Sequence, residues 1–138
     1  MKLVLDASIA VKWVLPEIET PKALSLRDDF RNGIHELIAP DTLLVEVAHA
    51  LTRAERRGLI QMREASAKLA DVLTTSPELH LYRPLLLRAV EISSQARIGV
   101  YDCLYLALAE REQCQFVTSD RRLGSLGLPY VVLLADAP

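Results

Sequence analysis

The sequence predicts an α/β protein in which helices cover a parallel β-sheet. Short β-prone runs alternate with longer amphipathic stretches, and hydrophobic residues make up 51% of the chain. Parallel strands need long crossover connections, which are usually helices, so this alternation favours a parallel sheet. The 138 residues fit one domain, residues 1–138. A chain of this size buries roughly two thirds of its unfolded surface.

The expected strands and helices follow one another in a regular order. Strand runs are short and apolar, whereas helical stretches carry apolar residues every three or four positions. In chain order we expect a strand at 2–5, helices at 9–14 and 21–30, a strand at 36–39, helices at 42–57 and 61–75, a strand at 79–82, helices at 84–96 and 100–112, and strands at 116–118 and 130–134.

Cap and turn residues set the boundaries of these elements. Ser8 is a suitable N-cap for the first helix, and Pro16 stops it. Asp41 is a suitable N-cap for the strongly amphipathic helix that ends before Gly58. Gly99 separates the two helices of the second half, and a polar tail follows the last strand.

Bulk charge and cysteine content exclude several classes of protein. A net charge of −2 argues against a protein that coats nucleic acid through a basic surface. The apolar segment 3–15 contains Asp6 and Lys12 and is too short to span a bilayer, so we interpret it as core, not as a signal or membrane segment. Cys103 and Cys114 lack a CxxC companion or a nearby His, which indicates a reduced, cytoplasmic setting and no zinc site.

Four acidic residues lie in apolar surroundings, where a carboxylate loses hydration unless it is paired, protonated or bound to a metal. They are Asp6, Glu46, Asp102 and Asp120. Asp6 and Asp120 come at the ends of predicted strands, and Glu46 lies in the apolar stripe of its helix. Taken singly, each acid has an ordinary structural explanation, such as a turn, a cap, an ion pair or the dipole at a helix start.

Taken together, the four acids predict a site for a divalent cation. The carboxyl ends of parallel strands share one edge, which brings Asp6 and Asp120 to the same rim. Each pair of like charges about 4 Å apart costs on the order of 4 kcal/mol at an effective dielectric near 20, and a hard cation removes that cost. Carboxylates without His or Cys favour Mg²⁺ over zinc, with Mn²⁺ left open. Such a site supports hydrolysis at phosphorus by a metal-activated water.

Two hydroxyl side chains lie close in sequence to this acidic set. Ser8 and Thr118 are each two residues from an acid, and their hydroxyls could orient a carboxylate or a bound water. Helix capping is the more ordinary role for both. His49, which follows Glu46 by about one turn, is left out of the catalytic set, because a lone His on a helix is more often a packing or pairing residue.

Four motifs at compatible separations carry a resemblance to a known family. They are LVLDAS at 3–8, EVAHAL at 46–51, YDCLYLALA at 101–109 and FVTSDRRL at 116–123. In this order they resemble the PIN domain, and among PIN domains the VapC-type ribonuclease toxins of prokaryotic toxin–antitoxin pairs. The family's metal-binding acids then map to Asp6, Glu46, Asp102 and Asp120. Members often carry Asn where this chain has His49.

The resemblance implies more than the residues themselves indicate. It implies a three-layer α/β/α fold with a central parallel sheet of four or five strands. It also implies endonucleolytic cleavage of RNA, a homodimer, and neutralisation by a cognate antitoxin whose peptide occupies the active-site groove. The four acids would serve as both metal ligands and catalytic residues.

Two other functions remain open at this point. Aspartyl-phosphate phosphatases also place acids at strand ends around magnesium, but they need a second acid two residues after the first, where this chain has Ser8. A PIN-like domain could also serve as a non-catalytic, regulatory protein-binding module. The complete set of four acids favours the nuclease over this module.

Overall fold

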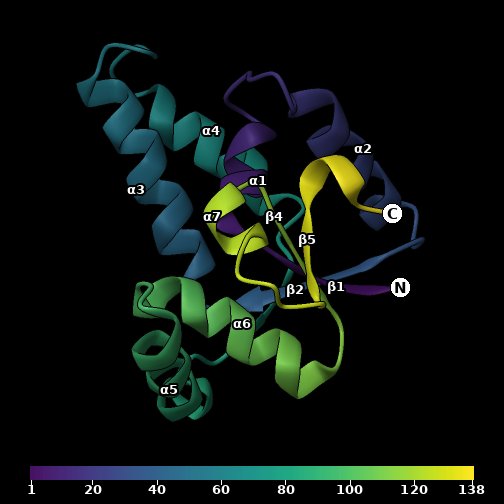
Figure 1. The fold of residues 1–138 in the computed structure, drawn as a ribbon. Helices are drawn as coiled ribbons and strands as arrows, with labels where there is room; N and C mark the ends of the chain where they lie inside the picture. Colours follow the sequence, from purple (N-terminus) through teal and green to yellow (C-terminus); the bar gives the residue numbers. More distant parts are fainter.

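The computed structural model describes residues 1–138 as a five-stranded, fully parallel sheet flanked by helices (Figure 1). The strands lie in the order β3-β2-β1-β4-β5. Their bounds are β1 Lys2–Leu5, β2 Glu36–Pro40, β3 Glu78–His80, β4 Gln115–Thr118 and β5 Val131–Leu133. The predicted α/β class with a central parallel sheet is confirmed.

Strand β1 occupies the centre of the sheet because it is the most completely apolar strand. Leu3, Val4 and Leu5 are fully buried, as expected for a strand that is covered on both faces. Val4 pairs with Ile38 of β2 on one side and with Phe116 of β4 on the other. Since all strands run in the same direction, their carboxyl ends lie along one edge of the sheet.

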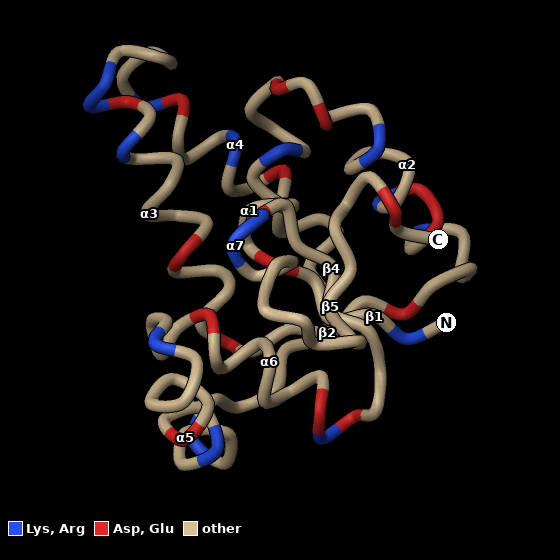
Figure 2. The backbone as a smooth tube through the Cα atoms, viewed as in Figure 1, with Lys and Arg blue, Asp and Glu red and all other residues tan.

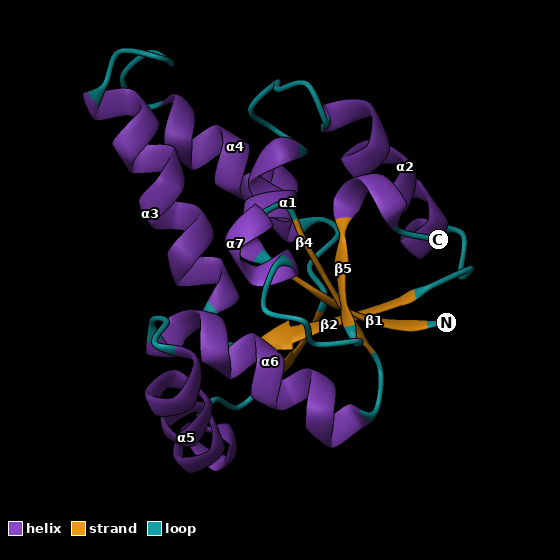
Figure 3. Ribbon diagram, in the orientation of Figure 1, coloured by secondary structure: helices purple, strands orange, loops and turns teal.

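Helices cover both faces of the sheet (Figures 1 and 3). They are α1 Ala7–Lys12, α2 Thr20–Arg31, α3 Leu43–Arg56, α4 Glu64–Leu73, α5 Leu86–Ala96, α6 Val100–Glu112 and α7 Arg121–Gly124, with 3₁₀ turns at Arg83–Leu85 and Leu134–Asp136. Every side chain of α6 from Cys103 to Ala109 is buried, because this helix is enclosed between the sheet and α5. None of the helices combines the length and the apolar character that a membrane crossing requires.

Two expected helix caps were wrong, and the third strand lies earlier in the chain than expected. Asp6, not Ser8, caps α1, because its carboxylate accepts the Ser8 backbone N–H. Asp41 does not cap α3, which begins after Thr42. The Asp41 carboxylate instead accepts the backbone N–H of Tyr82 at 3.0 Å. The third strand ends at His80 because the chain turns at Tyr82 into the 3₁₀ segment that contains Pro84.

A buried arginine joins three helices on the face that carries α1. Arg27 of α2 is only 3% exposed, and its guanidinium lies 4.8 Å from the ring centroid of Trp13. Its Nη2 donates to the backbone carbonyl of Asp71 at 2.7 Å and to the carboxylate of the same residue at 2.9 Å. Its Nε donates to the hydroxyl of Thr75. The cation–π contact and the hydrogen bonds therefore fix α2 against α1 and α4.

Replacing Arg27 with Met should lower the free energy of unfolding by about 1 to 3 kcal/mol, because buried acceptors lose their donor. Urea denaturation followed by circular dichroism would measure the change. Arg31→Met is the matched control on the same helix, since Arg31 is exposed and pairs only with Asp28. It should change stability by less than about 0.5 kcal/mol. Equal effects of the two substitutions would contradict a structural role for the buried network.

Candidate functional site

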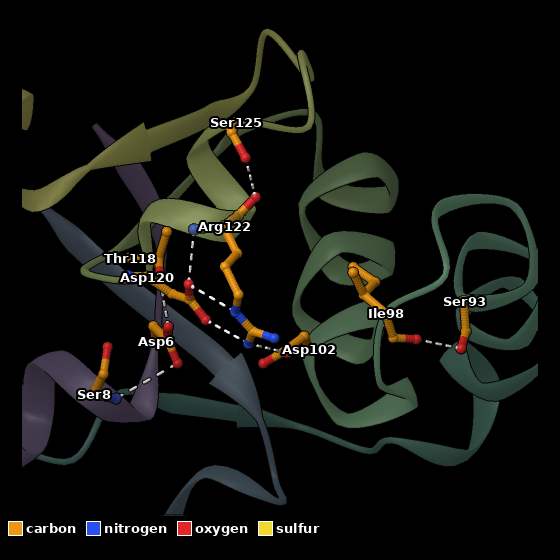
Figure 4. A network of polar contacts seen from close by, with 9 residues as sticks. All are labelled: Asp6, Ser8, Ser93, Ile98, Asp102, Thr118, Asp120, Arg122 and Ser125. Atoms are coloured by element: carbon orange, nitrogen blue, oxygen red, sulfur yellow. Dashed lines mark hydrogen bonds and ion pairs between the residues drawn. The ribbon is translucent and has the colours of Figure 1, made fainter.

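The structure brings the four predicted acids to the carboxyl edge of the sheet. Asp6 follows β1 directly, and Asp120 lies two residues beyond β4, the neighbouring strand. Glu46 and Asp102 lie in the first turns of α3 and α6. Figure 4 shows Asp6 and Asp120 on one side of the Arg122 guanidinium and Asp102 on the other, and Figure 2 shows the basic residues of α7 beside acidic ones at this edge.

Asp6 is held by groups on both of the strands that meet here. Its backbone N–H donates to the carbonyl of Val117 at 3.1 Å, which continues the β1–β4 ladder by one residue. Its carboxylate accepts the hydroxyl of Thr118 and, at 3.5 Å, the backbone N–H of Ser8. Burial raises the pKa of Asp6, the hydrogen bond from Thr118 opposes the shift, and the charge of Asp120 adds to it.

The two hydroxyls expected to support the acids play different parts. Thr118 is fully buried and donates to Asp6, while its oxygen accepts the backbone N–H of Asp120 at 3.0 Å. This hydroxyl therefore fixes two of the acids relative to one another. Ser8 contributes its backbone N–H to Asp6, whereas its hydroxyl oxygen is buried without a hydrogen-bond partner.

Glu46 is held by a tyrosine, Tyr105, that sequence reasoning missed. The hydroxyl of Tyr105 donates to Glu46 Oε2 at 2.6 Å, and Tyr105 is fully buried against Phe116, with 5.5 Å between ring centroids. Burial raises the pKa of Glu46 to about 7. The negative charge of Asp6 adds to this rise, and the hydrogen bond from Tyr105 opposes it. The one available signal was that Tyr105 lies three residues after Asp102 on the same helix.

Asp102 and Asp120 share a single arginine. Arg122 Nη2 lies 2.8 Å from Asp120 Oδ2 and 3.9 Å from Asp102 Oδ2. The hydrogen bond from Arg122 lowers the pKa of Asp120. The pKa of Asp102 is raised by burial and by the charges of Asp6 and Asp120. An ion pair was one of the ordinary explanations open to Asp120, but the sequence did not indicate that Arg122 would also reach Asp102 on a different helix.

The chemistry of this cluster suits a hard divalent cation. Its donors are carboxylate oxygens, the ligands that Mg²⁺ and Mn²⁺ prefer. Charge interactions link Asp6, Asp102 and Asp120 with each other and Glu46 with two of them, so all four lie within electrostatic range. As the side chains stand, no three acidic, His or Cys groups are close enough to hold one ion. A bound cation would therefore require side-chain rearrangement, and Arg122 is the group in between.

An apolar groove adjoins the acids at Glu46. It has a volume of about 790 Å³ and is lined by Thr42, Val45, Glu46, His49, Tyr82, Leu86, Val100, Tyr101 and Leu104. The aromatic residues Tyr82 and Tyr101 are 44% and 61% exposed on this surface. His49 is exposed and lines the groove, and no hydrogen bond joins its side chain to an acid.

Fold and site together define an α/β protein whose acids gather at the carboxyl edge of a parallel sheet. Residues 3–127 match the PIN domain family. The chain is also 33% identical over 125 residues to Ribonuclease VapC3 of Pyrobaculum aerophilum, which covers 89% of this chain and 92% of that protein. This protein therefore belongs to the PIN-domain family. The resemblance that the four sequence motifs indicated is confirmed.

Solved structures share the fold at lower identity. PAE2754 of Pyrobaculum aerophilum superposes with a TM-score of 0.71 at 21% identity, over 98% of this chain and 93% of that one. VapBC2 of Rickettsia felis, bound to a promoter DNA fragment, superposes with a TM-score of 0.67 at 14% identity, over 96% of this chain and 97% of that one. VapC20 of Mycobacterium tuberculosis, a toxin that cleaves the sarcin-ricin loop, superposes with a TM-score of 0.67 at 18% identity, over 94% of this chain and 98% of that one. These similarities establish the architecture alone.

Replacing Tyr105 with Phe should raise the pKa of Glu46 further, because the phenol hydrogen bond favours the ionised carboxylate. We expect a shift of up to about one unit, measured by NMR titration of the Glu carboxyl carbon in metal-free protein. Tyr101→Phe is the matched control on the same helix, since Tyr101 is exposed. An unchanged Glu46 titration in the Tyr105 variant would show that this contact does not hold the carboxylate in solution.

The metal-free protein should become less stable as the pH rises from about 4.5 to about 7. Glu46 has an ordinary pKa of 4.5 and a folded pKa of about 7, so in this window the native state holds a proton that the unfolded state has lost. The contribution of Glu46 to stability is therefore largest at a pH below its ordinary pKa and is lost as the pH rises through its folded pKa. Denaturant unfolding in EDTA at pH 5 and pH 8 would measure the difference in the free energy of unfolding between the two pH values. In Glu46→Gln this difference should be smaller by about 1 to 3 kcal/mol. Identical pH profiles would refute the assignment.

Proposed function

We propose that this protein is a metal-dependent endoribonuclease of the VapC type that hydrolyses RNA phosphodiester bonds in the cytoplasm as the toxin of a toxin–antitoxin pair. The observation that carries the proposal is the gathering of Asp6, Glu46, Asp102 and Asp120 at one edge of a PIN-domain sheet. Membership of the family and similarity to Ribonuclease VapC3 support the same activity.

The four acids are proposed as the ligands of the metal and as the catalytic residues. A divalent cation, Mg²⁺ or Mn²⁺, would supply charge neutralisation at phosphorus and lower the pKa of a coordinated water. The protein's own part is to hold the carboxylates in place: Thr118 orients Asp6, and Tyr105 orients Glu46. A Glu46 pKa of about 7 also lets this carboxyl accept or release a proton near neutral pH.

The groove beside Glu46 supports RNA as the substrate. Unpaired bases stack on exposed aromatic side chains, and Tyr82 and Tyr101 supply such surfaces next to the acids. By analogy with VapBC2, we also propose a cognate antitoxin as partner. A homodimer is proposed from the family resemblance. The continuous core of 34 buried residues supports residues 1–138 acting as one domain.

Neither alternative function gains support from the site. An aspartyl-phosphate phosphatase needs a second carboxylate two residues after the first, and the corresponding Ser8 instead offers Asp6 its backbone N–H. Binding a partner protein does not require three buried or half-buried acids with raised pKa values, whose burial costs hydration. Metal-dependent cleavage separates this module from the nuclease.

Asp6→Asn and Asp102→Asn should each reduce cleavage of single-stranded RNA on the order of 100-fold or more, because each substitution removes a charged oxygen from the site. Both should also weaken Mn²⁺ binding measured by calorimetry. EDTA should abolish cleavage by the unsubstituted protein, and added Mg²⁺ or Mn²⁺ should restore it.

Asp28→Asn provides the matched control for these variants. Asp28 lies on α2 with a side chain that is 66% exposed and pairs only with Arg31. Its substitution should leave both cleavage and Mn²⁺ binding unchanged. RNA cleavage that persists in EDTA would exclude the metal mechanism, and metal binding without any cleavage of RNA would favour the binding module.

A further inference from the structure

Arg122 is the one Lys or Arg side chain that forms an ion pair with any of the four acids. The pair does not belong to the core, because the Arg122 side chain is 73% exposed. Its carboxylate partners, Asp102 and Asp120, are about one-third exposed. This exposed side chain therefore places its guanidinium between Asp102 and Asp120, as Figure 4 shows.

The position of one nitrogen atom shows what this arginine does. Nη2 of Arg122 contacts Asp120 Oδ2 at 2.8 Å and lies 3.9 Å from Asp102 Oδ2. A positive group between two carboxylate oxygens supplies the neutralisation that a bound cation would otherwise supply. These two oxygens can then ligate a metal only after the guanidinium has moved.

Moving the guanidinium would leave the local backbone intact. Asp120 caps α7 through its other oxygen, because Oδ1 accepts the backbone N–H of Arg122 at 2.8 Å. The Nε of Arg122 also donates to Oδ1, at 3.3 Å, but the capping bond itself involves no side-chain atom of Arg122. Exposed ion pairs contribute little net stability, so solvent can replace the side-chain contact at low cost. Asp120 can thus release Oδ2 without losing its cap.

We propose that Arg122 is an internal counter-ion that competes with the divalent cation for Asp102 and Asp120. In the metal-free protein it limits repulsion among the acids, and it leaves when metal binds. The inference rests on the proposed function, since it assumes that these acids take up a metal. Its consequence is that the protein binds metal less tightly than its four acids alone would allow.

Calorimetric titration of Mn²⁺ into the full-length protein without RNA tests this competition directly. Arg122→Gln should bind Mn²⁺ about two- to tenfold more tightly than the unsubstituted protein, because the metal no longer displaces an ion pair. The Mn²⁺ affinity of Arg122→Lys should lie between those of Arg122→Gln and the unsubstituted protein, since an ammonium keeps the charge but cannot form the forked contact. The Mn²⁺ concentration that gives half-maximal cleavage should fall in the same order.

Arg121→Gln is the matched control. Arg121 is the preceding residue, is exposed, and makes no ion pair, so its substitution alters the net charge equally without touching the acids. Its effect on Mn²⁺ affinity should be clearly smaller. Equal affinity changes in Arg121→Gln and Arg122→Gln, or weaker binding in Arg122→Gln, would overturn the competition while leaving the nuclease intact. Absence of Mn²⁺ binding in every variant and in the unsubstituted protein would overturn both proposals.

Discussion

Repulsion among carboxylates at the edge of the sheet is the constraint on which the rest of the site depends. Asp6 is buried, and its pKa is raised by the loss of hydration and by the charge of Asp120. Such an arrangement is stable only if neighbouring groups hydrogen-bond to the carboxylates or neutralise them. The structure supplies a threonine hydroxyl to Asp6, a tyrosine hydroxyl to Glu46 and a guanidinium to Asp120. Three different chemical groups thus hold three acids within one small volume.

The order of the strands explains why these acids meet. The central strand β1 lies between β2 and β4, and the register that pairs Leu5 with Val117 carries the chain on to Asp6 and Thr118 as neighbours. Helix α6 packs against β1, β2 and β4, so its first turn begins at the same edge. Burial of β1 and α6 therefore both stabilises the fold and sets the geometry of the site. A substitution in this core would disturb the acids without contacting them.

Local patterns in the sequence were enough to predict the sheet, its acids and Thr118 as a supporting hydroxyl, but not which partner each acid takes. Each strand is a short apolar run. Asp6 follows such a run directly and Asp120 follows one after two residues, so neighbours in the sequence were enough to single out both acids. Tyr105 and Glu46 are separated by 59 positions, and Thr118 and Asp6 by 112. Only the folded chain reveals these contacts. The caps failed for a related reason: Asp41 and Ser8 are good cap residues in isolation, yet Asp41 binds Tyr82 across the sheet edge, and Asp6 takes the capping role from Ser8.

The division of protonation within the cluster follows from which acid accepts the hydrogen bond of Arg122. Asp6, Glu46 and Asp102 lose hydration, and their pKa values are raised, whereas Asp120 lies beside an exposed arginine and its pKa is lowered. Asp120 is therefore the acid that stays ionised most readily as the pH falls. The acids with raised pKa values would gain most from the proposed divalent cation, because an added positive charge favours their ionised form. At the proposed metal site, metal uptake and deprotonation of Glu46 would therefore be linked, and each would promote the other near neutral pH.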